Sequence, residues 1–202
     1  PLPHYRQRYV DFFVTDALRG LRVGVYQHSS VARDVLADVL AMLGADVKAF
    51  GRSDQFIPVD TEAVRDEDKL LVAEFARSMA VDAIVSTDGD ADRPLIADGS
   101  GQFLRGDLVG AITARLLGVT TLVTPVTSNS QLEKSFRRVT RTKVGSPFVI
   151  AGVEAARLAG HSPVIGFEAN GGVLLGDDIL HDGRRLPRLL TRDAMLPIVA
   201  AL

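Results

Sequence analysis

Three carboxylates and a guanidinium lie close together in the segment Asp88-Gly89-Asp90-Ala91-Asp92-Arg93. Only glycine and alanine separate the aspartates, so their charges would repel one another unless a cation lay among them. Magnesium suits such a site best, because it binds a few carboxylates and leaves its other positions to water or a phosphate oxygen. The segment therefore predicts that Asp88, Asp90 and Asp92 bind Mg²⁺, and that Arg93 holds a phosphate beside it through a forked contact.

Two other interpretations of this segment stay open, and a third fails on spacing. An EF-hand loop starting at Asp88 would need glycine at its sixth position and glutamate at its twelfth, where Arg93 and Gly99 stand. A phosphatase of the haloacid-dehalogenase type would use Asp88 as nucleophile and Asp90 as acid or base. It would also want threonine or valine where Asp92 stands. The remaining alternative is an acidic turn that satisfies only its own backbone.

Two further segments carry groups suited to a sugar phosphate. In Gly166-Phe167-Glu168-Ala169-Asn170-Gly171-Gly172, the Glu168 carboxylate and the Asn170 amide could accept from and donate to neighbouring sugar hydroxyls. The stretch 141–147 predicts a strand that ends at Lys143 and a helix that starts near Ser146, which together favour an anion site. A plain turn and a plain capped helix are the alternatives.

The elements around these segments alternate between strands and helices. Periodicity predicts strands at 21–26, 46–50 and 82–86, helices at 31–43 and 67–79, and a hairpin of 94–97 with 102–104. It then predicts helices at 107–117, 130–138, 148–159 and 186–202, and strands at 120–124, 139–143 and 163–167. This order predicts an α/β fold class: two consecutive three-layer α/β domains with mainly parallel mixed sheets, each with an antiparallel edge. The aspartate segment would then lie at the carboxyl end of a buried strand, where open α/β sheets bind ligands.

Composition narrows the class of protein. The chain has 202 residues, 47% of them hydrophobic, and a formal net charge of −2, which suits folded domains and lacks the basic excess of a nucleic-acid-binding protein. It has no apolar run near the roughly 18–20 residues of a membrane span. It also has no cysteine, which fits a reducing cytoplasm. Together these features predict a soluble cytoplasmic protein with no nucleic-acid or membrane partner. Scattered histidines are interpreted as surface or loop residues: His4, His28, His161 and His181.

The three segments, in this order and spacing, resemble the α-D-phosphohexomutases, the phosphomannomutase/phosphoglucomutase family. The match consists of Asp-Gly-Asp-Ala-Asp-Arg, then Thr-Lys-Val-Gly, then Gly-Phe-Glu-Ala-Asn-Gly-Gly. The resemblance implies that residues 21–103 form the family's second, metal-binding domain and residues 104–202 its third, sugar-binding domain. Residues 1–20 would lead in from a preceding domain. The chain would then be part of a longer Mg²⁺-dependent phosphohexomutase, and inactive as a mutase on its own.

The resemblance also implies roles for single residues. In the family a phosphoserine gives its phosphoryl group to a hexose phosphate, such as mannose or glucose 1- or 6-phosphate, through a bisphosphate intermediate. Asp88, Asp90 and Asp92 would bind Mg²⁺, with Arg93 in a supporting role. The sugar phosphate would be bound by residues of the other two segments: Glu168, Asn170, Lys143 and Ser146.

This sequence departs from the family pattern at several points. Many members have serine where Asn170 stands and histidine where Gly172 and Ser146 stand, so the resemblance assigns no general acid or base. The phosphoserine motif, Thr-Ala-Ser-His-Asn-Pro in form, has no counterpart in the sequence. The missing domains of the same parent chain are therefore expected partners. The alternative from another class is a non-catalytic module that binds metal or sugar phosphate.

Overall fold

The computed structural model describes residues 2–202, which divide into two compact units. Unit 1 comprises residues up to Leu104, and unit 2 comprises Arg105–Ala201. Both combine helices with a mixed sheet, so the predicted α/β fold class is confirmed. Among the described residues, none of the helices combines the length and apolar character needed to cross a membrane.

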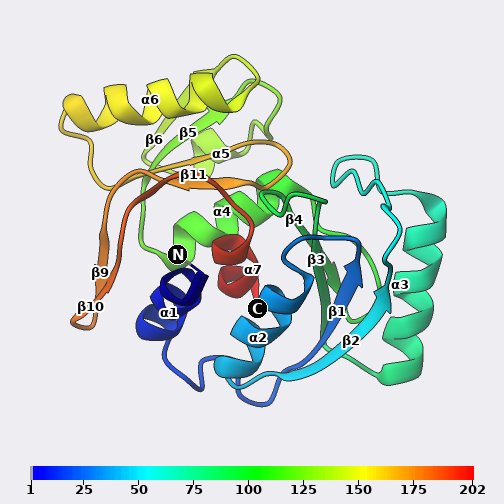
Figure 1. Ribbon diagram of the computed structural model, residues 1–202. Helices are drawn as coiled ribbons and strands as arrows, with labels where there is room; N and C mark the ends of the chain where they lie inside the picture. Colours follow the sequence, from blue (N-terminus) through cyan, green and yellow to red (C-terminus); the bar gives the residue numbers. More distant parts are fainter. Residues whose placement is uncertain (1) are drawn as a thin grey trace. The chain divides into compact units, whose positions relative to one another are not determined.

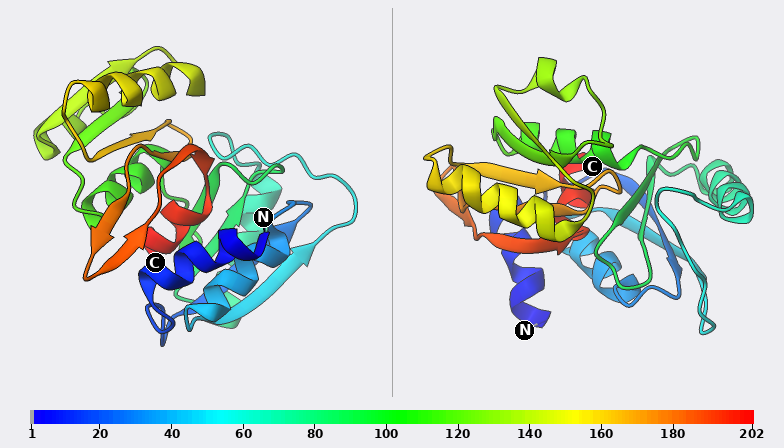
Figure 2. Two further views of the ribbon diagram at one scale, coloured as in Figure 1. Left: turned by 60° about the vertical axis from the view of Figure 1, so that its left-hand side comes forward. Right: turned by 90° about the horizontal axis from the view of Figure 1, so that it is seen from above.

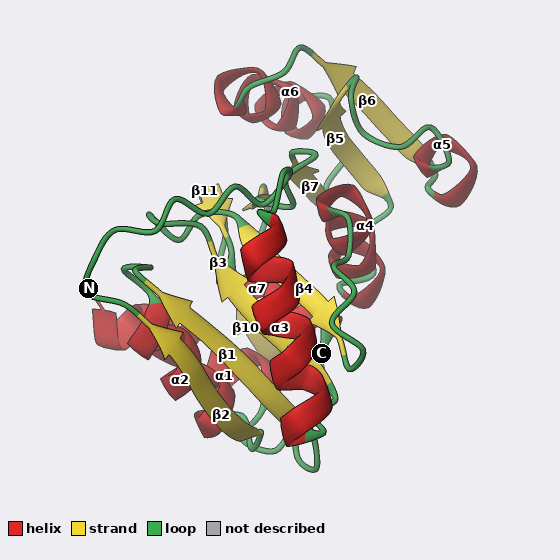
Figure 3. Ribbon diagram, turned by 90° about the vertical axis from the view of Figure 1, so that its right-hand side faces the viewer, coloured by secondary structure: helices red, strands yellow, loops and turns green. Residues whose placement is uncertain are grey.

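Unit 1 is a four-stranded sheet between helices. Its elements in chain order are α1 (Leu2–Phe13), β1 (Arg22–His28), α2 (Arg33–Met42), β2 (Asp46–Arg52), α3 (Asp66–Met79), β3 (Ala83–Thr87) and β4 (Pro94–Asp98). The strand order is β2-β1-β3-β4, with β1 parallel to β2 and β3, and β4 antiparallel at the edge. Figures 1 and 3 show α3 on one face of the sheet and α1 and α2 on the other.

The buried strands of unit 1 are apolar because both faces are covered. Val23 and Val25 of β1 are fully buried. On the α3 side, Tyr26 packs in a cluster with Val72 of α3 and Ile84 of β3. Residues 2–20 include α1, which packs on α2 and buries Tyr9 completely. The second half of the predicted hairpin is reduced to one bridge, between Ala97 and Phe103.

The buried carboxylate of Asp68 in α3 accepts a hydrogen bond from β1 and pairs with Arg65 at the start of the same helix. Asp68 is 3% exposed and accepts hydrogen bonds from Arg65 Nε (2.7 Å) and from the Tyr26 hydroxyl (2.7 Å). Burial raises the pKa of Asp68, but the bonds from Arg65 and Tyr26 outweigh it and hold that pKa below its usual range. Burial and the bond to Asp68 together raise the pKa of Tyr26. A depressed carboxyl pKa contributes stability above the unfolded value near 3.9, and that stability is lost as the pH falls through the folded pKa.

Replacing Asp68 by asparagine should therefore destabilise the chain at pH 7 and not in acid. We expect the free energy of unfolding to fall by about 2 kcal/mol at pH 7, because the Arg65 guanidinium loses its buried counter-charge. Urea unfolding measured between pH 7 and pH 3 checks this, since the difference between the variant and the wild type should shrink as the pH falls below the unfolded pKa near 3.9. Asp66→Asn, which removes an exposed pair with Lys69 on the same helix, is the control and should follow the wild type throughout. A pH-independent loss in Asp68→Asn would contradict the ionic origin.

Unit 2 has a five-stranded mixed sheet with the order β11-β8-β7-β5-β6. Its elements in chain order are α4 (Gly106–Leu116), β5 (Thr121–Pro125), α5 (Leu132–Ser135), β6 (Arg138–Thr142), α6 (Ser146–Leu158), β7 (Val164–Phe167), β8 (Val173–Leu175), β9 (Ile179–His181), β10 (Arg184–Leu186), β11 (Leu189–Asp193) and α7 (Met195–Ala201). β5, β6 and β7 run parallel, and β8 and β11 form the antiparallel side. Figures 1 and 2 show α6 on one face of this sheet and α4 and α7 on the other.

Two predicted helices of unit 2 need correction. The predicted helix at 186–202 is wrong: β10 ends at Leu186, β11 occupies Leu189–Asp193, and only Met195–Ala201 are helical. The leucines near 186–190 mimic a helical stripe, but Leu186 is buried in β10, which pairs with β9, and Leu189 is half-buried in β11, where it pairs with Leu175 of β8. Pro197 would stand in the interior of an uninterrupted helix, whereas in α7 it lies in the first turn, where its missing N–H is not needed. The predicted helix at 130–138 is shortened to Leu132–Ser135, because β6 already begins at Arg138.

Candidate functional site

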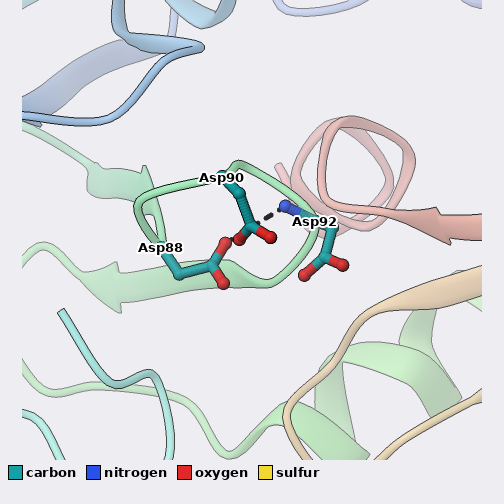
Figure 4. Close-up of side chains that lie close together, drawn as sticks. All are labelled: Asp88, Asp90 and Asp92. Carbon is teal, nitrogen blue, oxygen red and sulfur yellow. Dashed lines mark hydrogen bonds between the residues drawn. The ribbon is translucent and has the colours of Figure 1, made fainter. Parts of the chain in front are cut away.

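The aspartate segment forms the tight loop that joins β3 to the antiparallel β4. Its ends are tied by a bond from the backbone N–H of Asp88 to the carbonyl of Arg93, 3.0 Å long. Ala91 has a φ of 66°, a left-handed conformation that brings the loop back toward its start. The aspartate side chains consequently gather beside one another, as Figure 4 shows.

Asp88 organises this loop. Its side chain is 1% exposed, and Oδ1 accepts backbone N–H bonds from Asp92 (3.1 Å) and Arg93 (3.0 Å). Oδ2 accepts a bond of 2.6 Å from Arg93 Nε. Burial raises the pKa of Asp88, but the bonds from the Arg93 backbone and side chain outweigh burial and hold the pKa below its usual range. The loop therefore carries an ionised carboxylate at its base.

The carboxylates of Asp88, Asp90 and Asp92 form a donor set that fits a hard divalent cation. One oxygen of each lies within 4.8 Å of the others. In an octahedral site with bonds of about 2.1 Å, oxygen ligands are roughly 3.0–4.2 Å apart, so small side-chain movements would bring the three carboxylates to ligand positions of such a shell. Asp88 is buried, Asp90 exposed and Asp92 half-buried, so the site is open on one side to further ligands.

Arg93 contacts aspartates of its own unit, a role that the sequence did not indicate. Its guanidinium donates to the Asp88 carboxylate and lies 4.0 Å from Asp60 of the loop before α3, with 31% of the side chain exposed. The predicted forked phosphate contact stays a prediction, since the Nε edge is engaged with Asp88. In the geometry seen here, Arg93 serves first to shape the aspartate loop.

His28 is not a surface residue, which corrects the sequence-based interpretation. It is fully buried at the end of β1, and its Nε2 donates to the carbonyl of Thr87 at 2.8 Å. Burial lowers the pKa of His28 and outweighs the opposing effect of that bond, so the ring is neutral. Thr87 in turn shares a 2.7 Å bond with Ser30 and donates to the carbonyl of Asp88. The position of His28 just beyond a predicted strand next to the aspartate strand was the only available signal.

The loop after β7 places Glu168 and Asn170 in a tight, buried turn. Gly171 N–H donates to the carbonyl of Glu168 (3.0 Å), and Glu168 N–H donates to the carbonyl of Gly172 (3.2 Å). The side-chain oxygen of Asn170 accepts from Gly172 N–H at 3.0 Å, which leaves the NH₂ group as the donor for a ligand. Glu168 and Asn170 are 5% and 8% exposed, so the turn holds both side chains firmly.

The structure brings Ser146 to this loop but leaves Lys143 apart from it. Ser146 begins α6 and donates to Glu168 Oε2 at 2.8 Å. Within residues 2–202, Lys143 makes no hydrogen bond to Glu168 or Asn170, and its ammonium lies 5.6 Å from the centroid of the Phe148 ring. The sequence reasoning missed Arg192, which also contacts Glu168, because it assigned that stretch to a helix. Pro197, in the interior of the predicted helix, was the signal against it.

Comparison with known sequences assigns both units. The family model for phosphoglucomutase/phosphomannomutase alpha/beta/alpha domain II matches residues 4–101, and the model for domain III matches residues 105–202. The chain belongs to the phosphoglucomutase/phosphomannomutase family. Relatives in that family include a phosphomannomutase of Sinorhizobium fredii, 53% identical over 199 residues, and one of Salmonella muenchen, 45% identical over 201 residues. Each alignment covers 98% of this chain and 42% of the relative.

A solved structure of this family shares the fold. A phosphoglucomutase/phosphomannomutase family protein from Burkholderia thailandensis superposes with a TM-score of 0.74 at 18% identity, covering 99% of this chain and 42% of that protein. This similarity concerns the fold alone. The chain thus spans about two fifths of the length of the relatives it matches.

Proposed function

We propose that this chain supplies the metal-binding and sugar-binding domains of a Mg²⁺-dependent phosphohexomutase, with hexose phosphates such as mannose or glucose 1- and 6-phosphate as substrates. Residues 21–103 would bind the metal and residues 104–202 the sugar. The observation that carries the proposal is the cluster of Asp88, Asp90 and Asp92 on one loop, in a family whose relatives include phosphomannomutases. The lack of cysteine supports a cytoplasmic location.

The aspartate loop is built to hold a cation that neutralises phosphate charge. Asp90 and Asp92 would ligate Mg²⁺ together with Asp88, whose low pKa keeps it anionic at neutral pH. The bound ion would offset charge on a transferring phosphoryl group, and phosphoryl transfer depends mainly on such neutralisation and on positioning. Arg93 holds Asp88 in place by the 2.6 Å bond. His28 and Ser30 form hydrogen bonds to Thr87, the residue before Asp88, and so hold the start of the loop.

Glu168 and Asn170 provide a hydrogen-bond acceptor and a hydrogen-bond donor for neighbouring hydroxyls of a sugar. The Glu168 carboxylate would accept from one hydroxyl, and the Asn170 NH₂ would donate to its neighbour. We propose that Ser146 steadies Glu168 from the start of α6, and that Lys143 remains available to a phosphate because its ammonium is exposed. The phosphoserine would come from another domain, so turnover of mannose 1-phosphate by the 202-residue chain alone would contradict this division of roles.

The burial of Asp88 disfavours the phosphatase alternative. A nucleophilic carboxylate needs an oxygen that a phosphorus atom can approach. The Asp88 side chain is 1% exposed, and its hydrogen bonds leave one lone pair of Oδ2, which suffices for a small cation. Hydrolysis of p-nitrophenyl phosphate that disappears in Asp88→Asn would restore that alternative.

Calorimetric titration with Mg²⁺ and Mn²⁺ tests the metal site directly. Asp90→Ala should weaken binding by at least about tenfold, because it removes an exposed ligand with little effect on the loop backbone. Asp54→Ala, another exposed aspartate of unit 1 outside the cluster, is the control and should bind metal like the wild type. Equal affinities of the Asp90→Ala and wild-type chains would contradict the proposed site.

A further inference from the structure

Glu168 has two hydrogen-bond donors on one of its oxygens, and they come from two different elements of unit 2. Ser146 Oγ donates to Oε2 at 2.8 Å from the start of α6, and Arg192 Nη1 donates to the same atom at 3.2 Å from β11. We propose that Arg192 is a positioning residue, which holds the Glu168 carboxylate with Oε1 directed to a sugar hydroxyl. The inference rests on the proposed function of Glu168.

The charges and burial explain why an arginine is needed. The Glu168 side chain is 6% exposed, and burying a carboxylate is costly unless it is paired and hydrogen-bonded. A serine hydroxyl supplies one neutral hydrogen bond, whereas the guanidinium supplies a permanent positive charge. The Arg192 side chain is 29% exposed, so this charge lies at the boundary of the buried turn. Two donors on different elements restrict rotation of the carboxylate more than either would alone.

The strand that carries Arg192, β11, has an irregular register next to this residue. β11 pairs antiparallel with β8, but the register shifts between the pairs Leu189–Leu175 and Asp193–Val173. Such irregularities re-aim side chains and are frequent near functional sites. The next residue, Asp193, accepts from Met195 N–H at 3.0 Å and so begins α7, which anchors the end of the strand. The backbone on both sides of Arg192 is therefore held.

A nuclear magnetic resonance titration of the ¹⁵N-labelled 202-residue chain with mannose 1-phosphate tests the inference. The amide signals of residues 168–172 report binding at the turn. We expect Arg192→Gln to weaken binding about tenfold to a hundredfold and Arg192→Lys to stay within about fivefold of the wild type, because lysine keeps the charge. The matched control is Arg157→Gln, which breaks an ion pair with Asp177 elsewhere in unit 2. The Arg157 side chain is about as exposed as that of Arg192, and this variant should leave binding unchanged.

The outcomes separate this inference from the proposed function. Full binding by Glu168→Gln, or no binding by the wild type, would contradict the sugar-binding role and the inference with it. Weak binding by Glu168→Gln together with full binding by Arg192→Gln would overturn the inference alone. In the absence of ligand, the carboxyl ¹³C signal of Glu168 should move in Arg192→Gln and not in Arg157→Gln. An unmoved signal would also overturn the inference. If the glutamine variant does not fold, Arg192→Met removes the same charge and replaces it in both measurements.

Discussion

Asp88→Asn should abolish measurable Mg²⁺ binding and lower the free energy of unfolding by about 2–4 kcal/mol even without metal. Asp88 Oδ1 accepts from the N–H groups of Asp92 and Arg93, and Oδ2 accepts from Arg93 Nε. An amide has only one acceptor oxygen, so one of these donors would face the NH₂ group of the new side chain. The Arg93 guanidinium would also lose its closest counter-charge.

Calorimetry and urea unfolding measure the two effects of Asp88→Asn on one preparation. The control is Asp98→Asn, since Asp98 also accepts backbone N–H bonds, from Ser100 and Gln102, but in an exposed turn of unit 1. That variant should bind metal normally and lose less stability. Equal losses of stability in the two variants would contradict the structural role that the contacts of Asp88 indicate.

Gly106→Ala should distort the turn that carries Glu168 and Asn170. A Cβ at position 106 would lie 2.3 Å from the carbonyl carbon of Asn170 and 2.4 Å from the nitrogen of Gly171. These are backbone atoms, so the turn or α4 must shift to make room. We expect a loss of about 2–3 kcal/mol in the free energy of unfolding. This loss would occur although alanine favours helices by up to about 1 kcal/mol over glycine.

The same variant should weaken binding of mannose 1-phosphate by more than about tenfold, since displaced polar groups lose their alignment with a ligand. The amide shifts of residues 168–172 and thermal unfolding provide the measurements. Gly118→Ala is the control: Gly118 follows α4 with a φ of 67° and has no atom within 4 Å of an added Cβ. It should cost about 1 kcal/mol through backbone strain and leave the turn unchanged. A Gly106→Ala chain with wild-type shifts at the turn would contradict the close contact.

Local pattern was enough to predict most elements of both units. The apolar run ending near Ser86 became β3, and the helical spacing of 67–79 became α3, because each is buried against neighbours on the face that its periodicity specifies. The predicted helix at 186–202 failed for a related reason. The leucines near 186–190 are apolar in any conformation, and only the presence of the partner strands β9 and β8 makes strands the better arrangement for them.

The sequence by itself determined the α/β class and the aspartate loop, and it singled out Glu168, Asn170 and Ser146; the roles of these side chains stay predictions. These features depend on residues near one another along the chain, where spacing and turn chemistry act directly. Tertiary structure decided that His28 is buried beneath the aspartate loop, that Arg192 pairs with Glu168, and that Gly106 abuts the turn. Each of these contacts joins segments at least 24 residues apart, and hydrogen-bond satisfaction and close packing act only once the chain has folded.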